Sequence, residues 1–273
     1  MRRAATQTSD VAGLVVVVTG AARGIGAEVS RQLVARGARV GLVDVDEEAL
    51  LALADDLGEG ALAVPADVTD LVALDTAVAM AVERFGGLDV VIANAGIEVL
   101  GPIESMAPAD FDRVVEVDLL GVWRTIRACL PAIERRRGYV IVVTSVAGVT
   151  QGPFNAAYSS AKAGVVAIAR TLRLEVRSRG VAVGIVYFGY VATETARRSV
   201  SHPAMAPIMA RMPRRAREPV PVERAAAAIV KAIERRADRV VVPASMTPAV
   251  LFPEFAQALG ERWLGRGPVR WRE

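Results

Sequence analysis

Short runs of β-branched and other apolar residues alternate along this chain with longer stretches of helical periodicity. The short runs show no polar alternation, which is typical of parallel strands that are buried on both faces. The predicted strands are Val15–Thr19, Val40–Val43, Leu62–Val64, Val90–Ile92, Tyr139–Val143, Ala182–Val186 and Val240–Val242. This alternation predicts an α/β fold with three layers, in which right-handed crossovers build a doubly wound parallel sheet of seven strands.

Helical periodicity fills the stretches between these runs, and most of the helices end beside a glycine, a common C-cap. The predicted helices are Ile25–Arg36, Glu47–Leu57, Leu71–Phe85, Asp110–Arg137, Tyr158–Arg179 and Val222–Arg236. We therefore expect a single domain over residues 12–247, after a flexible N-terminus over residues 1–11. Residues 248–273 are expected to form a C-terminal helix and tail, with Phe252, Phe255, Leu259 and Trp263 on one apolar helix face.

Residues 190–221 interrupt this rhythm with five prolines, three methionines and many arginines. The segment is too long for an ordinary connection between a strand and a helix. One interpretation is a surface insertion without a role. We favour a mobile lid over a site at the carboxyl end of the sheet, because the apolar residues of the segment need a surface to cover.

Composition excludes several classes of function. A net charge of +3 gives no argument for nucleic-acid binding. The single histidine, His202, and the single cysteine, Cys129, exclude a multi-histidine metal site and an intrachain disulfide, and they argue against a Ser-His-Asp hydrolase. The apolar runs are too short for a signal peptide or a membrane span, so we expect a cytoplasmic protein with a soluble fold.

The first predicted strand runs into the glycine-rich turn Thr19-Gly20-Ala21-Ala22-Arg23-Gly24-Ile25-Gly26, where a helix begins. Glycines allow the backbone to approach a pyrophosphate closely, and a helix N-terminus offers free N–H groups and a positive partial charge. A glycine turn without any ligand is the alternative. The position between the first strand and the first helix favours dinucleotide binding through Gly20, Arg23, Gly24, Ile25 and Gly26.

Asp44 follows the second predicted strand, where an acidic side chain accepts hydrogen bonds from the adenosine ribose. A carboxylate there repels a 2′-phosphate, by about 4 kcal/mol at 4 Å and an effective dielectric of 20. Arg23 acts in the opposite sense, because it is able to pair with a phosphate. Since Asp44 lies at the ribose itself, we predict NAD(H) in preference to NADP(H).

Tyr158 and Lys162 stand four residues apart at the start of a predicted helix, so they share one helix face. A nearby ammonium favours phenolate and is expected to lower the pKa of the tyrosine, which then exchanges a proton with a substrate oxygen. Ser145, at the end of the fifth predicted strand, is placed to hydrogen-bond the same oxygen. Lysine occurs only twice in the chain, which makes the position of Lys162 informative.

With these motifs in this order, residues 12–245 resemble the short-chain dehydrogenase/reductase family, in its short, single-domain branch with a Tyr-x-x-x-Lys motif. The resemblance implies a Rossmann-like catalytic domain. It also implies that Ser145, Tyr158 and Lys162 are catalytic and that Lys162 binds the nicotinamide ribose. Asp67 and Val68 resemble the adenine contact of the family, and Asn94-Ala95-Gly96 resembles the motif beneath the cofactor.

The sequence departs from the family pattern at two places. Asp118 stands where the family usually has an asparagine that supports a water feeding protons towards the lysine. It is expected to fill the same role, and the alternative is a helix surface residue. Phe188-Gly189 replaces the family's Pro-Gly pair, while Val191 and Thr193 still occupy the positions that hold the nicotinamide carboxamide. This second departure is either an adaptation to substrate or an ordinary packing change.

The predicted pocket walls are mostly apolar, at residues 97–100, 146–154 and 188–190, and Gln151, Phe154, Phe188 and Tyr190 are the candidate substrate contacts. They favour NAD(H)-dependent interconversion of a hydrophobic secondary alcohol and a ketone. The alternatives are a ketoacyl-thioester reductase acting on a carrier-bound substrate, reduction of an imine or a carbon–carbon double bond, and a non-catalytic NAD-binding sensor or scaffold. The resemblance also implies a homotetramer or homodimer built through the helices Asp110–Arg137 and Tyr158–Arg179.

Overall fold

A computed structural model describes residues 10–212 and 217–264. Its seven strands form one sheet in the order β3-β2-β1-β4-β5-β6-β7, and all neighbouring strands pair in parallel. The strands are β1 (Val15–Thr19), β2 (Arg39–Asp44), β3 (Ala61–Pro65), β4 (Val90–Ala93), β5 (Tyr139–Ser145), β6 (Ala182–Phe188) and β7 (Arg239–Val242). The predicted doubly wound sheet is therefore confirmed.

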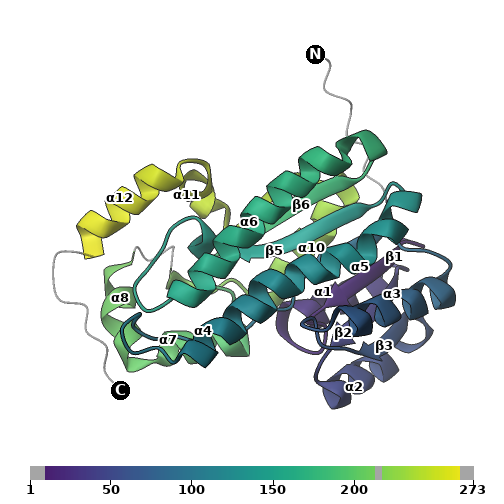
Figure 1. Cartoon of the computed structure of the whole chain (residues 1–273), viewed down its shortest axis with the longest axis horizontal. Coiled ribbons are helices and arrows are strands. Elements are labelled where there is room, and N and C mark those ends of the chain that lie inside the picture. Colours follow the sequence, from purple (N-terminus) through teal and green to yellow (C-terminus); the bar gives the residue numbers. More distant parts are fainter. Residues whose placement is uncertain (1–9, 213–216, 265–273) are drawn as a thin grey trace.

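Helices cover both faces of this sheet (Figure 1). The α-helices are α1 (Gly24–Val34), α2 (Glu47–Leu57), α3 (Leu71–Phe85), α4 (Pro108–Val115), α5 (Gly121–Arg135), α6 (Ala156–Val176), α7 (Glu194–Ser201), α8 (Ala206–Arg211), α10 (Val222–Arg235), α11 (Thr247–Leu251) and α12 (Pro253–Leu264). Short 3-10 turns are η1 (Gly58–Gly60), η3 (Val146–Gly148), η4 (Arg177–Arg179), η5 (Pro203–Met205) and η6 (Ala244–Met246). None of the helices in the described ranges is long and apolar enough to cross a membrane.

Strand residues alternate between two apolar cores, one on each face of the sheet. Val15 and Val17 belong to the core beneath α3, α5 and α6, whereas Val16 and Val18 belong to the core beneath α1, α2 and α10. Residues of both sets are almost completely buried, and each fully buried valine or leucine side chain contributes about 1.5–3 kcal/mol of burial free energy. The two-sided burial explains why the strands show no polar alternation in the sequence.

The predicted continuous helix over residues 110–137 is wrong in one respect. It begins at Pro108 and is divided by a π-helical segment, η2 (Glu116–Leu120), that separates α4 from α5. A π-turn inserts one extra residue and rotates the side chains that follow it, and such segments are frequent at functional sites. Asp118 lies within this segment.

The segment over residues 190–221 leaves the sheet after β6 and returns beside its own starting point. The N–H of Ala192 donates to the carbonyl of Val220 at 2.9 Å, and the N–H of Val220 donates to the carbonyl of Tyr190 at 2.8 Å. Between these ends the chain forms α7, η5 and α8, while residues 213–216 lie outside the described residues. The excursion is thus tied at its base and projects beyond the carboxyl ends of the strands (Figure 1).

The two ends of the chain differ from the expectation in detail. Val11 is buried in the core under α1, so residue 11 is part of the packed domain, whereas residues 1–9 lie outside the described residues. The predicted C-terminal helix is present as α12, with Phe252, Phe255 and Leu259 exposed beside it and on it. The side chain of Trp263 lies outside what the structure describes.

Candidate active site

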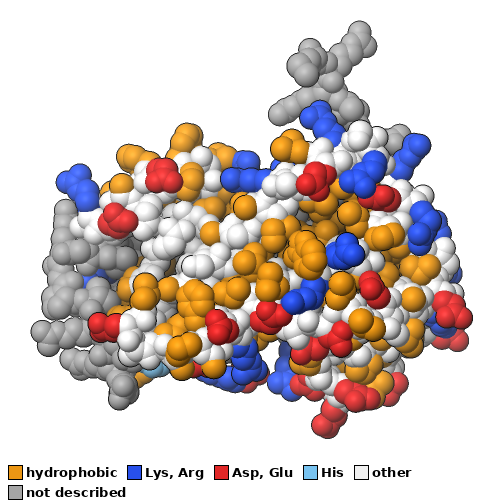
Figure 2. Space-filling view, in the orientation of Figure 1, with side chains coloured by type: hydrophobic (Ala, Val, Ile, Leu, Met, Phe, Trp, Pro, Cys, Tyr) orange, Lys and Arg blue, Asp and Glu red, His pale blue; other side chains and the backbone are white. Residues whose placement is uncertain are grey.

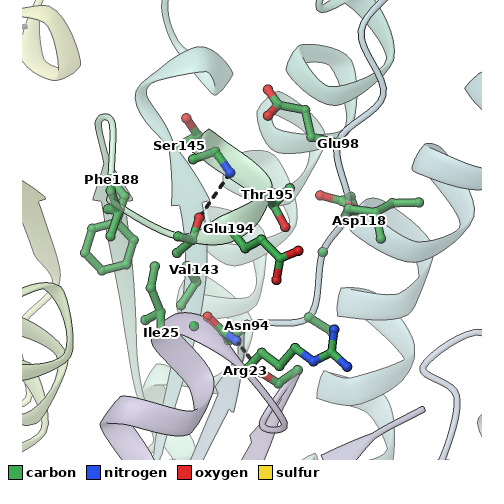
Figure 3. A pocket seen from close by; sticks show the side chains of 18 of the residues that line it. Arg23, Ile25, Asn94, Glu98, Asp118, Val143, Ser145, Phe188, Glu194 and Thr195 are labelled. Carbon is green, nitrogen blue, oxygen red and sulfur yellow. Dashed lines mark hydrogen bonds between the residues drawn. The ribbon is translucent and has the colours of Figure 1, made fainter. Parts of the chain in front are cut away.

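A cleft of about 500 Å³ opens at the carboxyl ends of the central strands, where the topology reverses between β1 and β4. In open parallel sheets this is the place where ligands bind. Figure 3 shows Arg23 and Asn94 at one end of the cleft, and Ser145 and Glu98 at the other. The described residues contain no cluster of side chains suited to a metal ion.

The glycine turn between β1 and α1 forms the floor of one end. Gly20 has a φ of +67°, and a Cβ added there would lie 2.8 Å from the Cα of Ala95. At Gly26 an added Cβ would lie 1.9 Å from the carbonyl oxygen of Gly20. No side chain caps the N-terminus of α1, since its capping residue Arg23 makes no such hydrogen bond. The turn therefore offers backbone N–H groups to an anion, which fits the pyrophosphate of a dinucleotide.

Asp44, at the end of β2, lines the same part of the cleft. Its carboxylate accepts hydrogen bonds from the N–H of Ala22 at 2.9 Å and from the N–H of Asp46 at 3.1 Å. Arg23 also lines the cleft, but its guanidinium is ion-paired with Asp46. The arginine charge is thus already matched, whereas the charge of Asp44 meets only neutral donors among the contacts described.

Asn94, after β4, supports the glycine turn rather than facing open space. Its side-chain amide donates to the carbonyls of Thr19 and Gly20 at 3.0 and 3.2 Å, and its N–H donates to Thr19 Oγ1 at 3.1 Å. Ala95 and Gly96 follow in the cleft wall. Asn94 thus holds the glycine turn in place, and the role of these three residues beneath a cofactor stays a prediction.

Asp67 and Val68 do not line the cleft as the structure describes it. The Asp67 carboxylate accepts from the N–H of Thr69 at 2.8 Å and is exposed, and Val68 is buried close to Gly121. Their contact with an adenine ring stays a prediction.

Tyr158 and Lys162 lie at the start of α6 and face the other end of the cleft. The ammonium nitrogen of Lys162 is 5.4 Å from the centre of the Tyr158 ring, so the two side chains share one face of the helix, as predicted. Ser145 ends β5, hydrogen-bonds Tyr158 and accepts from the N–H of Ala147 at 3.1 Å. The three predicted catalytic side chains are therefore together.

Asp118 is fully buried in η2, and the alternative of a helix surface residue is wrong. Its carboxylate pairs directly with the Lys162 ammonium at 2.9 Å and accepts from the N–H of Ile97 at 2.7 Å. Burial raises the pKa of Asp118, while the ammonium and the N–H of Ile97 oppose that shift. A Cβ at Gly96 would lie 2.8 Å from Asp118 Oδ2, so the glycine keeps room for the ion pair.

The pKa of Tyr158 is shifted in the direction opposite to the one expected. Burial raises it, and the negative charges of Glu98 and Asp118 raise it further, against the opposing hydrogen bond from Ser145. Lys162 does not lower it here because its charge is already matched by Asp118 at 2.9 Å. This environment therefore favours the protonated phenol over the phenolate.

The comparison with known protein families agrees with this geometry. The family model described as short chain dehydrogenase matches residues 14–204. The chain belongs to the short-chain dehydrogenase family. It is accordingly an oxidoreductase with a nicotinamide nucleotide, NAD(P), as its cofactor.

Three similar curated proteins illustrate the range of this family. The chain is 35% identical over 189 residues to "Oxidoreductase UcpA" of Salmonella typhimurium, covering 67% of this chain and 72% of that protein. It is 36% identical over 192 residues to "Trans-4-hydroxycyclohexanecarboxylate dehydrogenase" of Sinomonas cyclohexanicum, covering 67% and 74%. It is 32% identical over 202 residues to "3-oxoacyl-[acyl-carrier-protein] reductase FabG" of Escherichia coli, covering 74% and 82%.

For this dehydrogenase, the predicted substrate contacts divide into two groups. Phe188 lines the cleft, as do Gly189, Val191 and Thr193 of the following segment. Gln151, Phe154 and Tyr190 are not among the lining residues. Gln151 instead binds Gln257 of α12, with its N–H 2.7 Å from the side-chain oxygen of Gln257. Substrate contact by these three residues stays a prediction.

Glu98 is a cleft residue that the sequence reasoning missed, although it lies only two positions after Asn94-Ala95-Gly96. Its carboxylate accepts from the side-chain amide of Asn155 at 3.2 Å and from the hydroxyl of Ser199 at 2.5 Å. The pKa of Glu98 is raised overall, because burial raises it more than these two hydrogen bonds lower it. The only available signal was a charged residue within a predicted apolar wall.

Proposed function

We propose that the enzyme interconverts a secondary alcohol and a ketone with NAD(H), using Tyr158 as proton donor and acceptor. The observation that carries the proposal is the convergence of Ser145, Tyr158 and Lys162 at one end of a single cleft whose other end holds the glycine turn. A non-catalytic sensor has no need of this trio. Formation of NADH with any alcohol would exclude the sensor alternative.

The chemistry assigns one task to each side chain. When bound, the nicotinamide supplies the acceptor for the hydride of the alcohol carbon or the donor of hydride to the ketone carbon. Tyr158 accepts the hydroxyl proton in oxidation and returns a proton to the carbonyl oxygen in reduction. Ser145 donates a hydrogen bond to that oxygen, and Lys162 orients the ribose while Asp118 holds its ammonium in place.

Preference for NAD(H) is supported by Asp44 and by the pairing of Arg23 with Asp46. A 2′-phosphate near Asp44 would meet an unmatched negative charge, and the nearest arginine is already engaged. The test compares kcat/KM for the two reduced cofactors with one ketone. A clear preference for NADPH would overturn this part of the proposal.

The substrate is proposed to have a largely apolar body, because Ile97, Val143, Phe188 and Val191 are among the residues that line the cleft. The relative named for trans-4-hydroxycyclohexanecarboxylate acts on a ring alcohol, which is compatible with this proposal. The second candidate is a ketoacyl-thioester reductase, favoured by the similarity to the 3-oxoacyl-[acyl-carrier-protein] reductase and by Arg198 in the cleft wall. Bulky secondary alcohols with NAD⁺ and ketoacyl thioesters with NADH, measured side by side, distinguish the two.

Two further features belong to the same proposal. The excursion over residues 190–221 is proposed as a substrate lid, since four residues of α7 line the cleft, Glu194, Thr195, Ala196 and Arg198, and its N-cap Thr193 lines it as well. The enzyme is proposed to be a homodimer or homotetramer through α4, α5 and α6, where Figure 2 shows hydrophobic side chains gathered, with Phe111, Leu120, Trp123 and Leu174 exposed. Sedimentation of the wild type and of Trp123→Glu tests the assembly, and a monomeric wild type would contradict it.

A further inference from the structure

Glu98 is a carboxylate in the reacting end of the cleft that the proton transfer does not use. It stands on the loop after β4 and lines the cleft together with Tyr158 and Lys162. Asn155 holds one of its oxygens at 3.2 Å, and Ser199 of α7 holds the other at 2.5 Å. A carboxylate offers about four lone-pair sites, so both oxygens have capacity for a further donor.

Glu98 differs from the neighbouring carboxylates in its charge balance. Asp118 is paired with Lys162 at 2.9 Å, and Glu194 is paired with Arg198 at 3.1 Å. In the described ranges, no arginine or lysine forms an ion pair with Glu98, whose hydrogen-bond partners there are neutral. Among the described residues, Glu98 therefore has no counter-charge in direct contact, and Lys162 acts on it only through the longer-range electrostatic attraction.

Of the two groups that donate a hydrogen bond to Glu98, the Ser199 hydroxyl on α7 is the one that a bound molecule is able to replace. None of the residues of α7 is buried, so little apolar packing holds this helix against the body of the protein. The hydroxyl of Ser199 is a neutral donor, and a hydroxyl or ammonium on a bound molecule offers the same hydrogen bond or a charged one. Asn155, by contrast, is held by an isolated parallel β-bridge to Gly101, and it directly precedes the catalytic helix α6.

We propose that Glu98 recognises the substrate by accepting a hydrogen bond from a second donor group, a hydroxyl or an ammonium, that takes the place of the Ser199 hydroxyl. The proposal rests on the proposed alcohol–ketone chemistry and specifies its substrate class: an apolar body with a donor beside the reacting carbon, as in a diol, a hydroxyketone or an amino alcohol. A carboxylate at that position is rejected, because like charges repel at close range.

The test measures kcat/KM with NAD⁺ for cyclohexane-1,2-diol, trans-2-aminocyclohexanol and cyclohexanol. The diol ratio is kcat/KM for the diol divided by kcat/KM for cyclohexanol, and the amino alcohol ratio is defined in the same way. Hydrogen bonds to charged groups contribute about 1.5–3 kcal/mol and neutral ones about 0.5–1.5 kcal/mol, so Glu98→Gln, which keeps a neutral acceptor, is expected to lower the diol ratio about fivefold to tenfold. The amino alcohol ratio falls further, since glutamine keeps an acceptor but loses the charge. Ser199→Ala is expected to raise both ratios, because it removes the competing donor.

The matched control is Glu104→Gln, which removes an exposed carboxylate from the same loop outside the cleft. Both ratios stay within twofold of the wild type in this variant. Thermal unfolding of each variant shows whether the fold is retained. If Glu98→Gln and Ser199→Ala change the ratios in the same direction, Glu98 only ties α7 to the loop and the proposal is overturned.

Failure of the proposed alcohol–ketone chemistry is distinguishable from failure of the proposed role of Glu98. If the wild type oxidises none of the three alcohols, calorimetric binding of the diol in the presence of NADH replaces the kinetic ratio. Tighter binding of diol than of cyclohexanol by the wild type, lost in Glu98→Gln, supports recognition by Glu98 even then. Equal binding of both alcohols by the wild type overturns it.

Discussion

The two ends of the cleft are built on different principles. At the nucleotide end, backbone atoms set the shape: Gly20 and Gly26 leave no room for a side chain, and Asn94 and Asp44 bind main-chain groups. At the reacting end, side chains set the shape, and α7, which lines the cleft and hydrogen-bonds Glu98 through Ser199, has no buried residue. One end is thus fixed by the packed sheet, and the other depends on a few hydrogen bonds.

This difference between the two ends separates nucleotide binding, which the family shares, from the choice of substrate, which distinguishes its members. Nucleotide recognition through backbone geometry tolerates few substitutions, whereas a wall held by side-chain contacts changes its chemistry with a single residue. Elements with few buried apolar contacts also open at low free-energy cost. We therefore expect substitutions at the two ends to fail in different ways, and the following predictions test that expectation in order of decreasing effect.

Tyr158→Phe is expected to have the largest effect. General acid–base catalysis contributes about 10²–10⁴-fold, so kcat should fall by about that factor in both directions. Because the nucleotide end is independent of this hydroxyl, the Kd for NADH measured by fluorescence titration should change less than threefold. Wild-type turnover by the variant would remove the basis of the proposed mechanism.

Asp118→Ala tests the buried ion pair behind the catalytic end. Removing one partner leaves the Lys162 ammonium buried without its counter-charge, which typically costs about 3–5 kcal/mol of stability. Urea unfolding should show this loss together with a fall in kcat. Asp118→Asn keeps an acceptor for the N–H of Ile97 and is expected to retain most of the activity. Equal kinetics and stability for wild type and the alanine variant would show that the pair serves neither purpose.

The nucleotide end was largely predictable from the sequence, because its determinants are local. Gly20, Gly24 and Gly26 stand at fixed spacing after an apolar run, and a helix must begin there. The pairing of Tyr158 with Lys162 was predictable for the same reason, since a spacing of four residues fixes a shared helix face.

The reacting end was less predictable, because its contacts join segments far apart in the chain. Glu98 meets Ser199 across 101 positions, and no local pattern encodes that approach. The π-helical segment that turns Asp118 inward could not be predicted from the sequence either, since one extra residue in a turn leaves the apolar periodicity nearly unchanged. The error in the direction of the Tyr158 pKa shift has the same origin: the sequence showed Lys162 but not the carboxylate that matches its charge.

Asp44→Ala sharpens the comparison at the nucleotide end. Without the carboxylate beside the ribose, the ratio of kcat/KM for NADPH to that for NADH should rise at least tenfold, given about 4 kcal/mol for like charges at 4 Å and less when solvated. Asp46→Ala should give a smaller rise in the same direction, because it releases Arg23 from its ion pair. Asp56→Ala, at an exposed pair with Arg31, is the control and should leave the ratio unchanged.

The smallest effect predicted is a displacement of the pH profile. Oxidation requires the Tyr158 phenolate, so kcat/KM for an alcohol should rise with pH until the pKa of Tyr158 is passed. Reduction requires the phenol, so kcat/KM for a ketone should fall as the pH rises through the same pKa. Glu98 and Asp118 raise that pKa, and the charge of Lys162 is taken up by Asp118. Glu98→Gln removes one of the two negative charges and should move both limbs to lower pH, by less than about one unit.

The sign of this displacement distinguishes a charge effect from a loosened wall. If Glu98 acted only by holding α7 through Ser199, then Ser199→Ala would lower the rates in the same way and neither variant would move the profile. A shift in Glu98→Gln that is absent in Ser199→Ala therefore assigns the effect to the carboxylate itself. A shift to higher pH would contradict the electrostatic coupling between Glu98 and Tyr158, and with it the idea that single side chains set the chemistry of the reacting end.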